Sequence, residues 1–263
     1  MFTQSCRRRI SKRYGIAFTV ISLAAPMAAH ASDDPAAAQV ELSIDLWAFS
    51  VTTDNIVNGQ PASSYVPFST AAKNLNSGVF GQLIVHKGSW VFLVDITRVD
   101  LDLSGSDVPP EVEKTTIRNM WSTAGIGYAV QREASAGDHP LKVVVMPGVF
   151  AAYTSLDLGV TGRSNGLAAK VERDWLTPAP GGIVTLTSGK WGLRIQGYAD
   201  ISGRSRSARQ WAIALEYSPP STKFADPTFG FGYRYRYDEK VFGPDLKLNT
   251  ELKGPGIYAT FRF

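Results

Sequence analysis

Apolar and polar residues alternate along much of this chain, most clearly in its C-terminal half. Every second residue is apolar or small between Trp191 and Ser202 and again in Gln210–Ser218, and the residues between them are largely polar. In Phe229–Asp238, aromatic residues alternate with glycine and arginine. A period of two belongs to a β-strand, whose successive side chains point to opposite faces of a sheet. The pattern therefore predicts strands.

Similar segments recur from Gln39 to the C-terminus, with about the ~9–11 residues that a tilted strand needs to cross a membrane. Stretches rich in Gly, Pro, Ser, Asp and Asn separate them. Two of these, His86–Trp90 and Thr187–Trp191, are near copies that carry the glycine of a tight hairpin. The aromatic row of Phe229–Asp238 would favour aggregation in water but suits a lipid-facing surface. We therefore predict an all-β fold, a closed antiparallel transmembrane β-barrel.

The connections predict the number of strands. The short turns, which we place at the periplasmic end together with both termini, are His86–Trp90, Glu133–His139, Thr187–Trp191 and Ser218–Asp226. The longer, extracellular links are Val51–Asn76, Ser104–Glu113, Leu158–Lys170, Gly203–Ser207 and Asp238–Asp245. This arrangement gives about ten strands, and about eight or twelve remain compatible with the pattern. Within the first link, Ser63–Asn74 fits a loop, an inward excursion or one more strand.

Two stretches interrupt the alternation. Ile96 and Val99 both have the character of lipid-facing residues, which requires a β-bulge near Thr97. Three leucines near the C-terminus share the lipid-facing side of the last strand only if the strand slips at Gly254–Pro255. These leucines are Leu246, Leu248 and Leu252.

The last residues, Pro255–Phe263, form an amphipathic strand with a free C-terminal phenylalanine. This ending resembles the terminal strand of bacterial outer-membrane β-barrels, the segment that the barrel-assembly machinery reads. The resemblance implies that machinery as a partner, with an assembly signal made of Ile257, Phe261 and Phe263. Such a strand has to close a barrel, because an open edge in lipid leaves backbone groups unpaired at several kcal/mol each.

The N-terminus has the pattern of a signal peptide, residues 1–31. A basic stretch precedes the apolar Gly15–Ala25, and Ala29–Ala31 fits an A-x-A cleavage site. The apolar stretch is shorter than the ~20 residues of a membrane-spanning helix. We expect export to the outer membrane of a Gram-negative bacterium, with residues 32–38 as a flexible lead-in and residues 39–263 as the barrel.

Removal of this peptide changes the charge of the chain. Five of the 27 basic residues and none of the 23 acidic ones lie in it, which leaves 22 basic against 23 acidic residues. A net charge of −1 removes the main support for nucleic acid as a partner. The only cysteine, Cys6, also lies there, so the remaining chain has no thiol for disulfides, metal binding or catalysis.

Several short motifs together resemble one protein family. They are Asp45-Leu46-Trp47, Gly88-Ser89-Trp90, Gly189-Lys190-Trp191, Phe231-Gly232-Tyr233-Arg234-Tyr235, and Gly254-Pro255-Gly256 before Phe261-Arg262-Phe263. The chain resembles a family of uncharacterised Gram-negative outer-membrane β-barrel proteins whose final hairpin reads G-Y-R-Y … G-P … F-R-F. It departs from them at Asp174–Pro178, where members carry Trp-x-Asp-Pro. The resemblance implies a barrel and a compartment, and it supplies no activity or site.

Charged residues that alternate with lipid-facing ones should point into the lumen. These residues are Asp95, Arg194, Asp200, Glu216, Arg234, Arg236 and Arg262. A barrel of this size is filled mostly by side chains, so we expect a salt-bridge network that plugs it. The alternative is a narrow polar path with an arginine-lined constriction that favours anions. We expect interfacial anchors at Trp90, Trp191, Trp211, Tyr235 and Tyr237.

Candidate chemistry is sparse. Outer-membrane lipases, lipid A-modifying enzymes and proteases set a histidine beside a serine or an acid on the outer side. His86 and His139 instead fall in turns that we assign to the periplasmic side. We therefore expect a non-enzymatic monomer without cofactor or metal, with a structural or surface-interaction role. Its expected partners are outer-membrane lipid and lipopolysaccharide, whose phosphates the basic loop Gly203–Arg209 could bind. A narrow channel, a lipid-modifying enzyme and a soluble periplasmic lipid-binding barrel are the alternatives.

Overall fold

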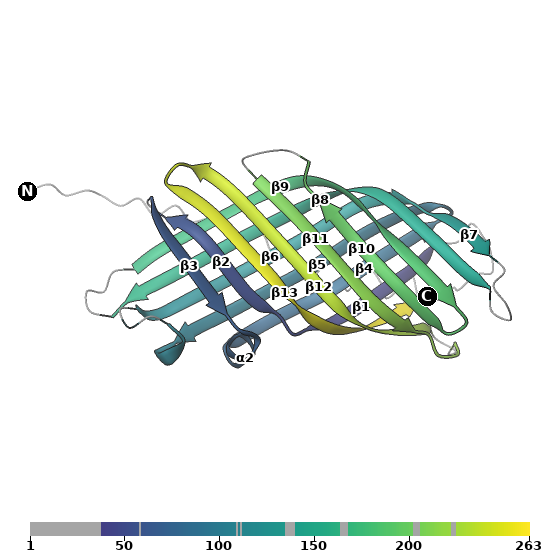
Figure 1. Ribbon diagram of the computed structural model, residues 1–263, viewed down its shortest axis with the longest axis horizontal. Helices are drawn as coiled ribbons and strands as arrows, with labels where there is room; N and C mark the ends of the chain where they lie inside the picture. The colour runs from purple at the N-terminus through teal and green to yellow at the C-terminus, as the bar shows by residue number, and fades with distance from the viewer. Residues whose placement is uncertain are drawn as a thin grey trace, which may run out of the picture. The chain divides into compact units, whose positions relative to one another are not determined.

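The computed structural model describes residues 38–57, 59–108, 110, 112–134, 140–163, 168–201, 206–221 and 225–263. The expected signal peptide and nearly all of the lead-in lie outside the described residues. The strands form one antiparallel sheet that rolls into a barrel (Figure 1). Around the ring they are β1 (Gln39–Trp47), β4 (Leu75–Lys87), β5 (Trp90–Ser104), β6 (Val112–Tyr128), β8 (Leu141–Gly162), β9 (Ala168–Ser188), β10 (Trp191–Ala199), β11 (Arg206–Tyr217), β12 (Asp226–Gly243) and β13 (Leu246–Arg262). The predicted closed antiparallel barrel of ten strands is confirmed.

The C-terminal strand closes the ring. β13 pairs with β12 on one side and with β1 on the other, from Glu41 opposite Arg262 to Trp47 opposite Gly256. Two backbone hydrogen bonds between Val40 and Phe263, of 3.2 and 2.9 Å, seal the end of this seam. A closed ring satisfies the backbone groups that a sheet edge would leave unpaired.

Tight turns join strands at the end that holds the C-terminus. Gly88 has φ +58° between β4 and β5, and Gly189 has φ +59° between β9 and β10. Glycine enters this left-handed region without a steric penalty, which explains the two near-copy sequences. At the same end, β7 (Val130–Ala134) follows β6 and pairs with β8.

The segment left open by the sequence forms a hairpin and a helix. β2 (Ser50–Val57) continues β1 beyond a break and pairs with β13 between Leu246 and Lys253, the part of β13 farthest from the C-terminus. β3 (Gln60–Val66) pairs with β2. A short helix, α2 (Phe68–Lys73), then leads into β4. A 3₁₀ turn, η2 (Gly105–Asp107), follows β5. Among the described residues, no helix is long and apolar enough to cross a membrane.

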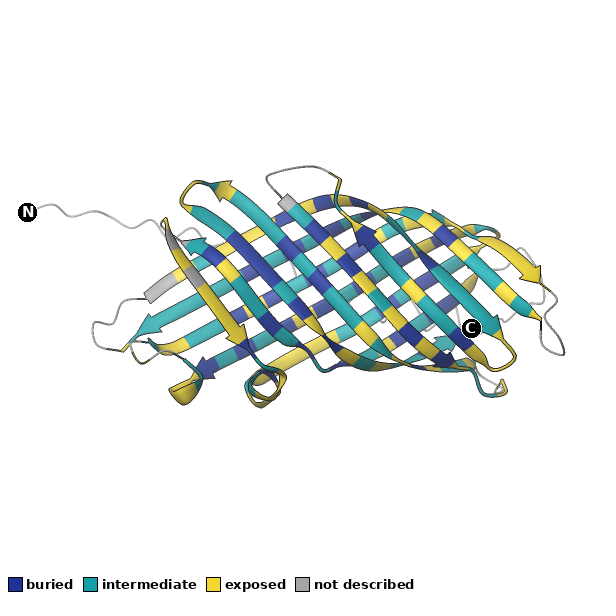
Figure 2. Cartoon of the chain, in the orientation of Figure 1, coloured by how far each residue is buried: buried dark blue, intermediate teal, exposed yellow. Residues whose placement is uncertain are grey.

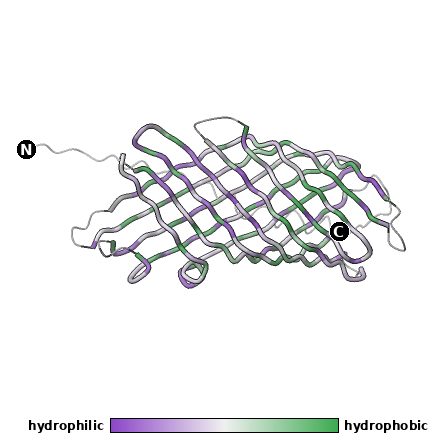
Figure 3. The backbone as a smooth tube through the Cα atoms, viewed as in Figure 1, coloured by the Kyte–Doolittle hydropathy of each residue, from purple (hydrophilic) through white to green (hydrophobic). Residues whose placement is uncertain are grey.

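Buried and exposed positions alternate along the strands (Figure 2), and the outer face changes character partway along them. Nearer the C-terminal end, outward residues are largely apolar. This apolar belt comprises the outward residues within Trp90–Ile96 of β5, Val145–Tyr153 of β8, Leu176–Val184 of β9, Trp211–Tyr217 of β11, Phe229–Tyr237 of β12 and Pro255–Phe263 of β13. Beyond it the outward residues are charged or polar, as in Arg98, Asp157, Asp174 and Lys253. Hydrophilic residues lie along the β12–β13 hairpin itself, at the end of the barrel away from the C-terminus (Figure 3).

The strands run well past the belt. β8 has 22 residues and β9 has 21, against the ~9–11 that a tilted strand needs to cross a membrane. The links predicted at Leu158–Lys170 and Asp238–Asp245 are therefore too long, because β8 and β9 extend into the first and β12 extends into the second.

Beyond the belt, the inward residues form an apolar core. Leu248 and Leu252 are 0% and 1% exposed, whereas Ile257 on the same strand faces outward at 53%. The predicted slip at Gly254–Pro255 and bulge near Thr97 are wrong, because the register of β12 with β13 and of β5 with β6 runs unbroken through both places. The regular alternation of each strand places Val99 and the three leucines, Leu246, Leu248 and Leu252, on its inward face. Their apolar character alone predicts a lipid-facing position, and the apolar core beyond the belt is what reverses it.

Three apolar clusters fill the interior together with the charged side chains. The first, which we call the outer cluster because it lies beyond the belt, contains Trp47, Phe49, Val51, Val66, Ala71, Val99, Leu101, Leu103, Ile117, Trp121 and Leu252. A second cluster, with Ile84, Leu93, Phe150 and Ile183 among its members, lies between β4–β5 and β8–β9. A third joins Leu156, Trp175 and Leu248. The interior is thus plugged by apolar packing as well as by the expected charges.

Candidate functional site

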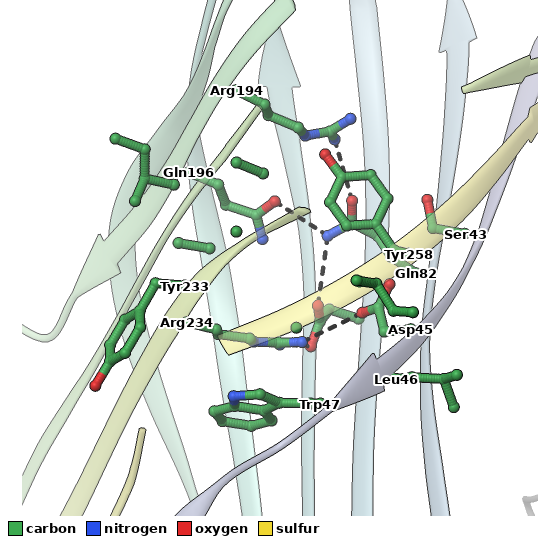
Figure 4. Close-up of a pocket in the computed structure, with 17 residues that line it drawn as sticks. Ser43, Asp45, Leu46, Trp47, Gln82, Arg194, Gln196, Tyr233, Arg234 and Tyr258 are labelled. Carbon is green, nitrogen blue, oxygen red and sulfur yellow. Dashed lines mark hydrogen bonds and ion pairs between the residues drawn. The ribbon is translucent and has the colours of Figure 1, made fainter. Parts of the chain in front are cut away.

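Arg234 of β12 forms the centre of a polar layer inside the belt (Figure 4). Its Nη2 donates to Oδ1 of Asp95 on β5 at 2.6 Å, and its Nη1 lies 3.5 Å from Oδ2 of Asp45 on β1. The guanidinium carbon lies 5.3 Å from the centre of the Trp47 ring. Trp47 belongs to the outer apolar cluster, so Arg234 lies where the polar layer meets that cluster.

Gln82 of β4 connects Asp95 to the next arginine. Its amide nitrogen donates to Asp95 at 3.4 Å and to Gln196 at 3.2 Å, and its oxygen accepts from Arg194 of β10 at 3.1 Å. Arg194 also lies 3.8 Å from Glu216 of β11 and 4.0 Å from Glu41 of β1. The network therefore crosses the lumen and joins strands from opposite parts of the ring.

Glycines make room for this layer. Gly232 and Gly256 face each other across β12 and β13, so neither strand projects a side chain into the lumen there. A cavity of about 90 Å³ lies beside them, lined by Arg234, Arg194, Gln82 and Tyr258 among others. Such a cavity holds a few waters, whereas pockets for drug-sized ligands measure about 300–1,000 Å³.

A second buried arginine extends the network towards the outer end. Arg236 is fully buried and donates to Asp238 at 3.0 Å and to Gln210 at 3.1 Å. Its guanidinium lies 5.5 Å from the ring centre of Trp121, and Thr154 donates to Asp238 at 3.0 Å. The charge is therefore paired, hydrogen-bonded and covered by an aromatic ring, as a buried charge requires.

Arg262 and Glu41 form the rim at the C-terminal end. Arg262 donates to one oxygen of Glu41 at 2.9 and 2.6 Å. His86 lies in β4 instead of the predicted turn, because β4 continues to Lys87, and its Nε2 is 3.4 Å from Glu41. His139 lies outside the described residues.

The structure joins most of the predicted lumen charges and adds others. Asp95 pairs with Arg234, and Arg194 lies near Glu216. Asp200 lies just past the end of β10, where its backbone N–H donates to Ala208 at 2.7 Å. Sequence reasoning missed Glu41, Asp45, Gln82, Gln210, Asp238 and Tyr258. Glu41 and Asp45 already alternate with apolar residues in β1, which is the signal that could have identified them.

The predicted anchor residues lie on the outside of the barrel. Trp90 packs against Tyr128, and Trp191 against Tyr217, both next to the tight turns. At the far edge of the belt, Trp211 stacks on Tyr235 with ring centres 5.7 Å apart, and Tyr237 donates to Glu239 at 2.7 Å. Two aromatic groups therefore border the belt. Of the predicted assembly residues, Ile257 is exposed and Phe261 and Phe263 are half-buried.

The polar layer pairs its buried carboxylates with arginines or hydrogen-bond donors. The carboxylates named above have arginine or hydrogen-bond partners, and no group of three His, Cys, Asp or Glu side chains suited to a metal ion occurs in the part of the chain that the structure describes. The polar layer is thus a network of paired charges and hydrogen bonds inside the belt.

No protein-family model and no curated protein matches the chain. Among solved structures it is similar to the outer membrane protease OmpT from Escherichia coli, with 8% identity, 90% of this chain and 100% of that chain covered, and a TM-score of 0.46. It is also similar to the CymD monoaromatic hydrocarbon channel, with 10% identity, coverage of 88% and 91%, and a TM-score of 0.28. For the toluene transporter TodX of P. putida the identity is 7%, the coverage 86% and 89%, and the TM-score 0.22. Such distant likenesses carry no argument about activity or ligand.

Proposed function

We propose that the chain is an integral β-barrel protein of a Gram-negative outer membrane, with a closed lumen and a structural or surface-interaction role. The observation that carries this proposal is the apolar belt with its aromatic borders. Exposed rows such as Phe229, Phe231 and Tyr233 would aggregate in water, and lipid accommodates them. The charged strands beyond the belt then stand above the outer leaflet.

The filled interior supports a closed lumen. Arg234 reaches across to Asp95 within the belt, and Trp47 and Trp121 cover the two central arginines on the outer side. An ion would have to break these buried pairs and then cross an apolar cluster, both of which are costly. The protein in this proposal is a monomer, since one chain closes the ring by itself, and the proposed role requires no cofactor.

The polar groups also support a non-enzymatic role. The cavity beside Arg234 is too small for a lipid or peptide substrate, and His86 interacts with Glu41 at the C-terminal, periplasmic end. Partners in this proposal are outer-membrane lipid, lipopolysaccharide and the barrel-assembly machinery. A comparison of lipid A masses from cells with and without the protein tests the enzymatic alternative. An altered acyl or phosphate pattern would contradict the proposed role.

Two measurements test the class and the closed lumen. The protein should fractionate with outer membranes and migrate differently on a gel before and after boiling, as membrane barrels do. Reconstituted in planar bilayers, it should give no ion-conductance steps under conditions in which a porin does. Recovery in a soluble periplasmic fraction would overturn the membrane assignment. Steps abolished by a substitution at Arg234 would replace the closed lumen by the narrow-channel alternative.

A further inference from the structure

The barrel wall forks on one side. β1 pairs with β4 from Gln39 opposite His86 to Ile44 opposite Gly81, and the pairing ends there. Beyond that point β1 and then β2 follow β13, while β4 follows β5. We call the two facing edges, Asp45–Phe49 and Leu75–Phe80, the fork. Among the described residues, no strand pairs with either of these edges on the side of the fork.

Exposure supports a real separation of the two edges. Ser77, Gly78 and Val79 are all exposed, although successive residues of a strand point to opposite faces. Leu75 and Asn76, at a shift in the register of β4 with β5, are exposed as well. A strand in a continuous wall would bury its inward side chains, as β5 does from Val91 to Leu103. The outer half of β4 therefore has an accessible inner face as well as an accessible outer one.

The fork begins at the outer edge of the belt. Val79 lies opposite Arg98, the first charged residue on the outer face of β5, and Leu46 lies opposite Ile257 of the belt. Leu46 and Val79 are 67% and 55% exposed. The fork thus starts in contact with the proposed hydrocarbon and continues upward into the polar zone. Water and lipid head groups can hydrogen-bond its open backbone edges there, which relieves the cost of unpaired groups.

Aromatic side chains line the inner side of the fork. The rings of Trp47, Phe49 and Phe80 lie 5.6 to 6.3 Å apart, and Phe80 is only partly buried. The connecting segment also carries exposed apolar residues, Tyr65 at the end of β3 and Phe68 at the start of α2. Exposed apolar side chains therefore lead from the belt, past Leu46 and Val79, to Phe80, and the buried ring of Trp47 packs directly against Phe80.

From this continuity we propose that the fork binds an acyl chain of an outer-leaflet lipid, which lies between Leu46 and Val79 against Trp47 and Phe80. The binding rests on the proposed membrane location. A hydrocarbon chain suits this place because the exposed side chains of Leu46 and Val79 are apolar, and it is the molecule present at that level of the proposed membrane. The head group remains in the polar zone beside the open edges.

Tryptophan quenching by lipids with brominated acyl chains tests the proposal. Three variants each keep one of the six tryptophans, Trp47, Trp121 or Trp211, and replace the others by phenylalanine. Trp47 and Trp121 belong to the same buried cluster, but Trp121 lies behind the continuous wall of β6. Trp47 should be quenched nearly as strongly as the outward Trp211, and Trp121 far less. Equal protection of Trp47 and Trp121 would overturn the proposal, whereas an unquenched Trp211 would instead overturn the membrane location.

A matched pair of substitutions locates the binding. Val79→Glu puts a charge into the fork and should protect Trp47 from brominated lipid. Leu176→Glu puts the same charge at the edge of the belt on β9, opposite Tyr153 of β8, and should leave the quenching unchanged. If the tryptophan variants do not fold, a photo-crosslinking residue at Phe80 should form lipid adducts and one at Phe150 should not. Adducts at neither position, or protection of Trp47 by both glutamates, would count against the fork.

Discussion

Arg234 and Asp95 meet across the lumen, with Nη2 of the arginine 2.6 Å from Oδ1 of the aspartate. Their strands, β12 and β5, are not neighbours, since β13, β1 and β4 separate them on the shorter way around the ring. The pair therefore ties two sides of the barrel together through its interior. Both side chains are largely buried, so each depends on the other for compensation of its charge.

Removal of Arg234 should destabilise the barrel strongly. Arg234→Met leaves Asp95 and Asp45 without their arginine, and an uncompensated buried charge costs about 3–5 kcal/mol. Arg98→Met removes an exposed arginine that pairs with Asp100, for which we expect less than about 1 kcal/mol. Urea unfolding in lipid vesicles measures both. Equal losses would mean that the lumen is far wetter than the structure implies.

The assignment of Leu248 to an apolar core gives a second prediction. Leu248→Ala should cost about 2–5 kcal/mol, because it empties a fully buried site. The neighbouring Lys247→Ala loses an ion pair with Glu239 at the surface and should cost less than about 1 kcal/mol. Unfolding free energies of the two variants are the measurement. A small loss for Leu248→Ala would restore the interpretation of this leucine as an outward residue.

Gly230 is required by the tyrosine that covers it. A methyl group at this position would clash with the ring of Tyr258, whose hydroxyl donates to Glu216 at 2.5 Å. Gly230→Ala should therefore destabilise by about 1–3 kcal/mol through overpacking. Gly159→Ala is the matched control, because its methyl group would meet only Thr116 at 3.8 Å. Its effect should be neutral or stabilising by up to about 1 kcal/mol, and a similar loss at both positions would refute the packing argument.

Cysteine labelling should locate the outer edge of the belt. Ser155 and Ala151 both face outward on β8, on either side of Tyr153. A membrane-impermeant maleimide should label Ser155→Cys on intact cells and leave Ala151→Cys unlabelled, because the proposed membrane covers only Ala151. Lys142→Cys, at the end near the C-terminus, should react only after the cells are opened. Labelling of Lys142→Cys on intact cells would reverse the proposed orientation.

The sequence predicted the barrel because its strands carry local signals. The alternation around Phe229–Asp238 and the glycines of the two near-copy turns depend only on nearby residues and on the solvent of each face. Ring closure followed from the amphipathic last strand, since an unpaired edge is costly in lipid. These features need no knowledge of which strands meet across the lumen.

The sequence could not predict where the apolar belt ends. An apolar residue faces outward inside the belt and inward beyond it, so Ile257 and Leu252 have the same character and opposite orientations. In the sequence alone, this exchange of faces looks like a bulge in the strand. Cross-lumen pairs such as Gln82 with Arg194 were beyond reach for another reason, because they join residues that are distant along the chain and around the ring.

The ring is complete without residues 50–74. β1 alone joins β13 to β4, and the hairpin of β2 and β3 is attached to the barrel by its pairing with the outer part of β13. Val66 and Ala71 of this excursion nevertheless pack into the outer apolar cluster. Residues 50–74 therefore cover the end of a barrel that is already closed without them. The length and composition of this segment can change between related chains without altering the number of strands in the barrel. Sequence diversity among such chains should therefore concentrate there.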